Sequence, residues 1–163
     1  MTKFEFVAKY KPYALECQQA TGLHYHATLV QAALESGWGA SAPGNNFFGI
    51  KDTDGVNGNE QLLRTTEVLK HDKGKFPEII SITKSGANFI YKIRDWFRKY
   101  DSPAKGFKDH AEFFVKNPRY RFAWAVRHDA ELFLKEVAKA GYATDPDYEK
   151  KLIETLKWFQ ANA

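Results

Sequence analysis

One carboxylic acid, Glu35, stands in an otherwise uncharged stretch of this sequence. It is the only charged side chain between Glu16 and Lys51, although charged residues make up 27% of the chain and roughly nine would be expected over that length. Apolar surroundings solvate a carboxylate poorly, so the group keeps its proton to higher pH than in water. Glu35 is therefore a candidate general acid that protonates a leaving group. The alternative is a structural glutamate that caps a helix or pairs with a distant cation.

Cleavage of a glycosidic bond normally needs a second carboxylate, which stabilises positive charge on the sugar or activates water. The acidic residues of the following segment are Glu60, Glu67, Asp72 and Glu78. Glu67 lies inside a predicted strand, which is a rigid position for a catalytic group, whereas Glu60 and Asp72 are expected in loops. We therefore prefer Glu67 as the second carboxylate. The alternative is a solvated strand residue with no catalytic role.

Residues 45–51, with the sequence NNFFGIK, form the next unusual segment. Gly49 permits a positive φ or a close approach of the backbone. The asparagine side chains can fix a turn or bind a sugar amide or hydroxyl. The segment is either part of a binding site or a structural corner packed by Phe47 and Phe48.

Glu35 must be positioned by a helix over residues 25–36, because apolar residues recur there at helical spacing. Gly37 is expected to end this helix. Helical spacing also places Gln31, Glu35 and Trp38 on one face, adjacent to the apolar stripe. Among the four tryptophans, Trp38 is therefore the best candidate to line a binding cleft.

The remaining elements follow from periodicity and from capping residues. In the N-terminal part, helices are expected over residues 2–20, where Pro12 kinks or splits the helix, and over residues 25–36. In the last third, helices are expected to start at Ser102-Pro103, to cover residues 122–126, and to follow the capping residue Asp129. The last helix is expected to be capped by Asp145-Pro146 and to have Tyr148 in its buried stripe. The expected strands cover residues 62–69, 78–83 and 88–100. Helices, a small sheet and helices again predict an α+β fold, with residues 1–163 as a single domain and a β-lobe at about 52–100.

Bulk composition excludes several classes of function. The net charge of +4 and pI near 9.0 suit an anionic polymer such as nucleic acid or a bacterial wall. Cys17 is the only cysteine, so no internal disulfide forms, and the five histidines lack the spacing of metal ligands. No glycine-rich phosphate loop is present, and no run approaches the length of a membrane span. We expect no metal, cofactor or membrane insertion.

Two segments, 33–39 (ALESGWG) and 46–51 (NFFGIK), resemble the N-acetylglucosaminidase family of bacterial autolysins and flagellar peptidoglycan hydrolases, glycoside hydrolase family 73. Residues 97–100 (FRKY), Asp109-His110 and residues 141–148 (GYATDPDY) are similar to further family stretches, in the same order. The resemblance spans roughly residues 25–152. It implies a lysozyme-like fold, with a mainly helical lobe, a small antiparallel β-lobe and a cleft between them. It also implies hydrolysis of the β-1,4 bond between N-acetylglucosamine and N-acetylmuramic acid.

The resemblance also assigns roles to residues. The helix-borne acid of the family falls on Glu35, the second carboxylate fits Glu67 best, and the functional tyrosine falls on Tyr142. Residues 70–86 look like an expansion of the β-lobe, which makes Glu67 the less secure of the two carboxylates. The residues expected to build or line the cleft are Asn46, Phe48, Lys51, Phe97 and Tyr100. Inversion, a covalent intermediate and attack by the substrate's own N-acetyl group all stay open as mechanisms.

The sequence therefore predicts an endo-β-N-acetylglucosaminidase that acts on peptidoglycan glycan strands. The alternatives are a muramidase or lytic transglycosylase, such as a phage lysin, and a non-catalytic module that binds the wall or nucleic acid. The N-terminus lacks the pattern of a signal peptide, so we expect a signal-independent route to the periplasm or cell wall, or a shortened chain. Of these settings we prefer an antibacterial effector delivered by a type VI-like machine. Such an effector would need a cognate immunity protein, with acidic and polar groups, that blocks its cleft.

Overall fold

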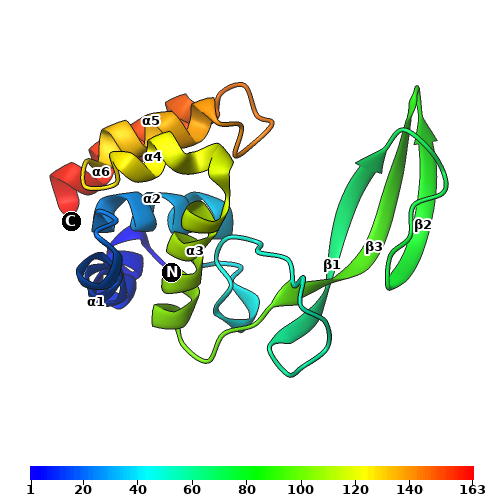
Figure 1. The fold of residues 1–163 in the computed structure, drawn as a ribbon, viewed down its shortest axis with the longest axis horizontal. Helices are drawn as coiled ribbons and strands as arrows, with labels where there is room; N and C mark the ends of the chain where they lie inside the picture. The colour runs from blue at the N-terminus through cyan, green and yellow to red at the C-terminus, as the bar shows by residue number, and fades with distance from the viewer. The chain divides into compact units, whose positions relative to one another are not determined.

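The helices and the strands of this chain belong to two different units of the computed structural model, which describes all residues 1–163 (Figure 1). Unit 1 comprises Met1–Phe48 and Tyr100–Ala163 and contains every helix. Unit 2 comprises Gly49–Lys99 and contains every strand, close to the segment 52–100 expected for a β-lobe. No helix is both long enough and apolar enough to cross a membrane.

Unit 1 is organised around its second helix. Its elements are α1 (Lys3–Thr21), α2 (Tyr25–Ser36), η1 (Pro43–Asn45), α3 (Pro103–Lys116), η2 (Pro118–Tyr120), α4 (Arg121–Ala125), α5 (Ala130–Lys139) and α6 (Tyr148–Asn162). α2 packs against α1, α5 and α6. Its residues from His26 to Ala33 are all buried, including the polar side chains of His26, Thr28 and Gln31, so α2 is the central helix of the unit.

The ends of the helices follow the capping residues, with two corrections. Ser102 caps α3 and Asp129 caps α5, as predicted. α1 runs on as one helix through Pro12, so the expected split is wrong; the buried side chains of α1 keep their helical spacing on both sides of the proline. α6 starts at Tyr148 rather than at Asp145-Pro146, because the Asp145 carboxylate accepts the backbone N–H of Asp147 in a turn before the helix.

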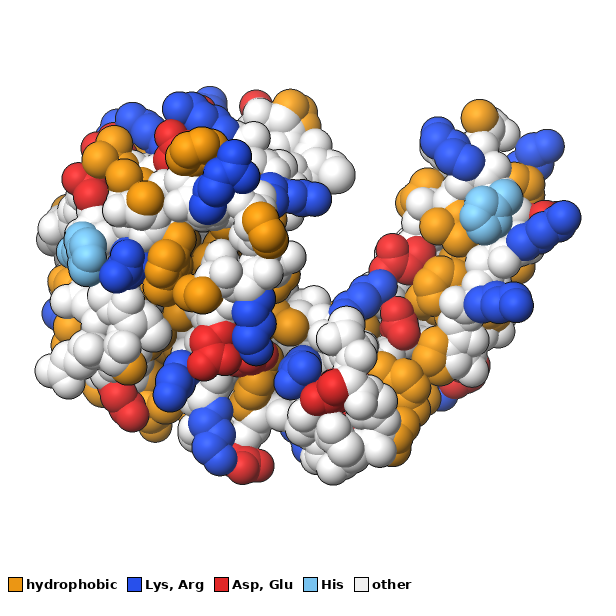
Figure 2. Space-filling view, in the orientation of Figure 1, with side chains coloured by type: hydrophobic (Ala, Val, Ile, Leu, Met, Phe, Trp, Pro, Cys, Tyr) orange, Lys and Arg blue, Asp and Glu red, His pale blue; other side chains and the backbone are white.

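Unit 2 is a three-stranded antiparallel sheet in the order β1-β3-β2, with β1 at Glu60–Leu69, β2 at Glu78–Ser85 and β3 at Asn88–Arg98. Side chains alternate between the two faces of a strand. Tyr91, Ile93 and Phe97 of β3 are buried on one face, and this face also carries the half-buried odd-numbered residues of β1. Every residue of β2 is exposed, and Figure 2 shows hydrophobic side chains on the surface of this unit.

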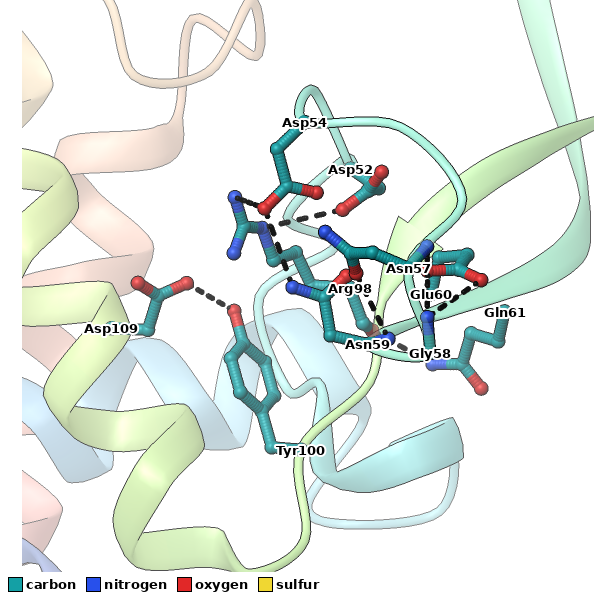
Figure 3. Close-up of polar contacts among 10 residues, drawn as sticks. All are labelled: Asp52, Asp54, Asn57, Gly58, Asn59, Glu60, Gln61, Arg98, Tyr100 and Asp109. Atoms are coloured by element: carbon teal, nitrogen blue, oxygen red, sulfur yellow. Dashed lines mark hydrogen bonds and ion pairs between the residues drawn. The ribbon is translucent and has the colours of Figure 1, made fainter.

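A polar loop fixes where β1 begins and β3 ends (Figure 3). Glu60, expected in a loop, is the first residue of β1, and its carboxylate accepts the backbone N–H groups of Asn57 and Gly58. Arg98 pairs with Asp52 at 3.7 Å and with Asp54 at 3.5 Å. These contacts hold the loop against the last residue of β3, which ends at Arg98 rather than at residue 100.

Candidate active site

Glu35 lies in the last turn of α2, where a charge is unfavourable. Gly37 ends the helix in the left-handed conformation (φ 59°) and donates its N–H to the carbonyl of Ala33. The C-terminal end of a helix carries partial negative charge, which disfavours a second negative charge nearby. No basic residue lies in this last turn to offset it. The position of Glu35 therefore favours the neutral acid.

A chain of hydrogen bonds holds the Glu35 carboxyl group. Tyr148 Oη donates to Glu35 Oε1 at 3.2 Å, and the buried Gln31 Nε2 donates to Tyr148 Oη at 3.2 Å. Surrounding protein atoms displace water and raise the pKa of Glu35, although the bond from Tyr148 lowers it in part. This is the direction expected from the uncharged sequence. The side chain still remains exposed on one side, so a substrate can reach it.

Tyr142 lies beside this group. Its ring stacks nearly parallel to that of Tyr148, with 5.9 Å between centroids, and also contacts the rings of Phe114 and Tyr120. Burial, and then the negative charge of Glu35, raises the pKa of Tyr142 well above its ordinary value. Tyr142 is therefore a neutral phenol that can donate a hydrogen bond. The structure thus brings Glu35 and Tyr142 together, and the catalytic role of each stays a prediction.

Tyr148 is the residue of this group that the sequence analysis missed. It was expected only in the buried stripe of the last helix, and the structure does bury it while using its hydroxyl at Glu35. Burial raises the pKa of Tyr148, so the phenol stays protonated. Its place at the end of the family-like stretch 141–148 was the available clue.

The expectation that Trp38 shares a face with Glu35 is wrong. α2 ends at Ser36, and Trp38 itself has a positive φ of 56°, so helical spacing does not extend to it. Its ring stacks on Phe159 with 5.3 Å between centroids and meets Phe6 and Trp158 edge-on. A role for Trp38 in substrate binding stays a prediction.

Asn46 and Phe48 are both buried in unit 1. Asn46 Oδ1 accepts the N–H of Phe48, which matches the structural corner considered for residues 45–51. The ring of Phe48 stacks on the buried imidazole of His110, with 3.6 Å between centroids and 11° between planes. Burial lowers the pKa of His110 to about 3. Contact of Asn46 or Phe48 with substrate stays a prediction.

Tyr100 is held in place by three bonds. Its hydroxyl donates to Asp109 at 2.5 Å (Figure 3), its N–H donates to the carbonyl of Gly44, and its carbonyl accepts from Asn45. α3 packs closely here, because a Cβ at Gly106 would lie 2.4 Å from the Asn45 carbonyl oxygen. Tyr100 thus has a structural role, and its predicted role in binding stays untested.

In unit 2, Lys51 joins two carboxylates. Its Nζ lies 2.6 Å from Glu67 Oε1 and 3.1 Å from Asp95 Oδ2. The backbone of Lys51 forms an isolated bridge with Phe97, which is buried. Asp95 is the second residue that the sequence analysis missed, because the acidic candidates were sought between residues 60 and 78. Strand alternation could have found it, since Asp95 lies two residues before Phe97 on the same face.

No group of three or more histidine, cysteine, aspartate or glutamate side chains is arranged to hold a metal ion. Lysine and arginine side chains are spread over the visible surface, with acidic side chains among them (Figure 2).

A family model described as mannosyl-glycoprotein endo-beta-N-acetylglucosaminidase matches residues 11–161. The chain belongs to this glucosaminidase family. It is 34% identical over 155 residues to the peptidoglycan hydrolase FlgJ of Vibrio parahaemolyticus, covering 91% of this chain and 45% of FlgJ. It is 35% identical over 136 residues to the exo-glucosaminidase LytG of Bacillus subtilis, covering 77% and 40%. The chain thus spans less than half of the length of these relatives.

Solved structures confirm the predicted fold. A C-terminally truncated glycoside hydrolase domain of Salmonella typhimurium FlgJ matches with a TM-score of 0.73 and 29% identity, covering 99% of this chain and all of that domain. The α+β, lysozyme-like class and the glycoside hydrolase class predicted from the sequence are both confirmed. A chain from a type VI secretion effector–immunity complex of Pseudomonas protegens matches with a TM-score of 0.54 and 17% identity, which shows a shared fold alone.

Proposed function

We propose that this chain is a peptidoglycan hydrolase that cleaves the β-1,4 bond between N-acetylglucosamine and N-acetylmuramic acid. The observation that carries the proposal is Glu35, a carboxyl group with a raised pKa, hydrogen-bonded by Tyr148 and accessible from one side. Further support comes from the names of two relatives, the peptidoglycan hydrolase FlgJ and the exo-glucosaminidase LytG.

In this proposal Glu35 is the general acid. The proton donor must be neutral when substrate binds, and the helix end and local burial both favour that state. The Tyr148 hydroxyl is hydrogen-bonded to Glu35 Oε1, while Glu35 Oε2 has no hydrogen-bond partner within the protein. Glu35 Oε2–H can therefore protonate the glycosidic oxygen as the bond to the sugar carbon breaks. Gln31 fixes the direction of the Tyr148 hydroxyl and thereby the plane of the carboxyl group.

Glu67 has the second role, as the base that activates water or as the carboxylate that stabilises the oxocarbenium-like sugar. Its carboxylate lies 2.6 Å from the Lys51 ammonium, which supports a fixed orientation for it. Tyr142 is a neutral donor beside Glu35, suited to hydrogen-bond an oxygen of the sugar at the cleavage point. Attack by the substrate's own N-acetyl group is the third route, and in it Glu67 would act only through its charge.

We further propose that the enzyme acts in the periplasm or at the cell wall, as an antibacterial effector with a cognate immunity protein. The support is the fold shared with a chain of the Pseudomonas protegens effector–immunity complex, and it extends to the fold alone. Co-expression with the product of a neighbouring gene tests this setting. Stoichiometric inhibition of wall digestion by that product is the expected result, and its absence for all neighbouring genes would count against it.

Fragment analysis of digested peptidoglycan tests the activity directly. A glucosaminidase releases fragments with a reducing N-acetylglucosamine end, which borohydride labels and mass spectrometry identifies. A muramidase would leave a reducing N-acetylmuramic acid end, a lytic transglycosylase an anhydro sugar, and a binding module intact polymer. The variant Glu35→Gln, digested in parallel, is expected to release no fragments.

A further inference from the structure

Glu67 and Asp95 lie on the same face of the sheet but are not neighbours along the ladder. Asp95 pairs with Leu63, which is four residues before Glu67 on β1. At about 3.4 Å per residue, four positions separate their backbones by roughly 14 Å. Strand pairing alone therefore does not bring the two carboxylates together, and a third side chain must span between them.

Lys51 is that side chain, and its backbone is fixed. The N–H of Asp52 donates to the carbonyl of Trp96 at 3.0 Å, and the N–H of Arg98 donates to the carbonyl of Ile50 at 2.9 Å. These two bonds flank Lys51 and attach its segment to β3. With the backbone held, the long side chain reaches both carboxylates, at 2.6 Å for Glu67 and 3.1 Å for Asp95.

The side chains of Lys51, Glu67 and Asp95 differ in how far they are exposed to solvent. The side chain of Asp95 is 18% exposed, that of Glu67 is 32% exposed, and that of Lys51 is 43% exposed. Asp95 is thus the most enclosed of the three, and Glu67 is the more accessible carboxylate. Burial lowers the pKa of Lys51, but its hydrogen bonds to Glu67 and Asp95 outweigh this effect and raise it, so the ammonium stays charged.

A second cross-strand ion pair in the same sheet has a different character. Arg94 pairs with Glu78 at 3.2 Å, and both side chains are about half exposed, at 49% and 46%. It joins one cation to one carboxylate, and pairs of this kind contribute little to stability. The Lys51 network differs because one cation is shared by two carboxylates.

We infer that Lys51 and Asp95 are positioning residues for Glu67: Asp95 fixes the Lys51 ammonium, and the ammonium holds the Glu67 carboxylate in one orientation on the sheet. The inference rests on the proposed function of Glu67 as the second carboxylate. It replaces the predicted role of Lys51 as a substrate contact. An ammonium engaged by two carboxylates has less capacity left to bind a sugar.

The test is the effect of Lys51→Met, Lys51→Arg and Asp95→Asn on kcat and KM with soluble peptidoglycan fragments. Without the ammonium, the Glu67 carboxylate loses its fixed orientation, so kcat in Lys51→Met should fall by about tenfold. KM should change less than about twofold, since substrate binding is not the property lost.

Conservative and control variants complete the design. Lys51→Arg keeps the charge and should restore most of kcat. Asp95→Asn should lower kcat with little change in KM, because the ammonium loses its anchor. Arg94→Met, which removes the other cross-strand cation, should match the wild type in kcat and KM.

The contrary outcomes separate this inference from the function on which it rests. A raised KM with an unchanged kcat in Lys51→Met would make Lys51 a substrate contact and overturn the inference. Glu67→Gln is measured in the same assay: full activity there removes Glu67 from the mechanism and the inference with it. Loss of activity in Glu67→Gln, together with wild-type kcat and KM in Lys51→Met, overturns the inference and leaves the proposed function intact. If Lys51→Met does not fold, Lys51→Arg and Asp95→Asn decide by the same measurements.

Discussion

The two carboxylates proposed for catalysis have opposite surroundings in the two units. Glu35 in unit 1 is at the negative end of a helix, has no cation beside it and accepts one hydrogen bond from a phenol. Glu67 in unit 2 lies 2.6 Å from a lysine ammonium. Burial raises the pKa of Glu35 and so favours its neutral form, whereas the Glu67 carboxylate is held by an ion pair. Two residues of one chemical type are thus held in different ways, one by a phenol and the other by an ammonium.

The largest effect is expected at Glu35. Glu35→Gln keeps the shape of the side chain but removes the transferable proton, so the rate of wall digestion should fall by about 10²–10⁴-fold. The thermal unfolding midpoint should stay close to that of the wild type, because the side chain is exposed on one side. The matched control is Glu154→Gln, an exposed residue of α6 paired with Lys150, which should remain fully active. Equal activity of the two variants would place the proton donor elsewhere.

A second test concerns His110, a residue of unit 1 that, like Glu35, has no charged partner. His110 is fully buried, and neither ring nitrogen has a hydrogen-bond partner. Its folded-state pKa of about 3 lies below the unfolded value of about 6.5. The unfolded chain therefore binds more protons between these values, and the free energy of unfolding falls as pH drops through this window. The loss should amount to several kcal/mol, since each pH unit is worth about 1.4 kcal/mol.

His110→Phe should reduce this pH dependence without abolishing it, because phenylalanine can keep the stack on Phe48 without titrating, while His26, whose pKa burial lowers to about 4, still titrates in the same window. Urea unfolding at pH 7 and at pH 4 measures the difference. The control is His71→Phe, which changes an exposed loop histidine and should retain the slope of the wild type. An unchanged slope in His110→Phe would show that another group drives acid unfolding.

A smaller effect is expected at Tyr148. Tyr148→Phe keeps the ring stack but removes the hydroxyl that donates to Glu35, and a hydrogen bond of this kind is worth about 1 kcal/mol. The bond lowers the pKa of Glu35, so its loss should raise that pKa further. Activity requires the protonated acid, and the basic limb of the pH profile should therefore move to higher pH.

The control for this prediction is Tyr13→Phe, because the hydroxyl of Tyr13 makes no hydrogen bond within the protein. The basic limb of the pH profile of the Tyr13→Phe variant should coincide with that of the wild type. A basic limb that moves to lower pH in Tyr148→Phe would contradict the role given to the phenol.

The smallest effect is expected at the surface pair in unit 2. Arg94→Met should change the free energy of unfolding by less than about 1 kcal/mol, because its bond to Glu78 is exposed. Chemical denaturation at low and high salt measures it, and the difference from the wild type should shrink as salt rises. A larger, salt-insensitive loss would mean that the Arg94–Glu78 pair and the Lys51 network do not differ as described.

The parts of the structure that follow local rules were predictable from the sequence. The bounds of α2, its end at Gly37 and the upward shift of the Glu35 pKa follow from periodicity, from glycine and from a missing charge. Tyr148 was missed because its partner Glu35 lies 113 residues away in the sequence, and Asp95 because acidic candidates were sought only between residues 60 and 78. Trp38 was misplaced because helical spacing was carried past the residue where the helix ends. Chain-local patterns thus locate an acid, and only the folded chain shows what holds it.

The most direct test of the account is a titration of the Glu35 carboxyl group in the intact protein. Carbon-13 NMR of glutamate-labelled protein, with Glu35→Gln used to assign the resonance, follows this one group. The account predicts a midpoint above the ordinary glutamate value of 4.5. A midpoint at or below that value would contradict it, because the proposed proton donor would then be an anion when the sugar bond must break.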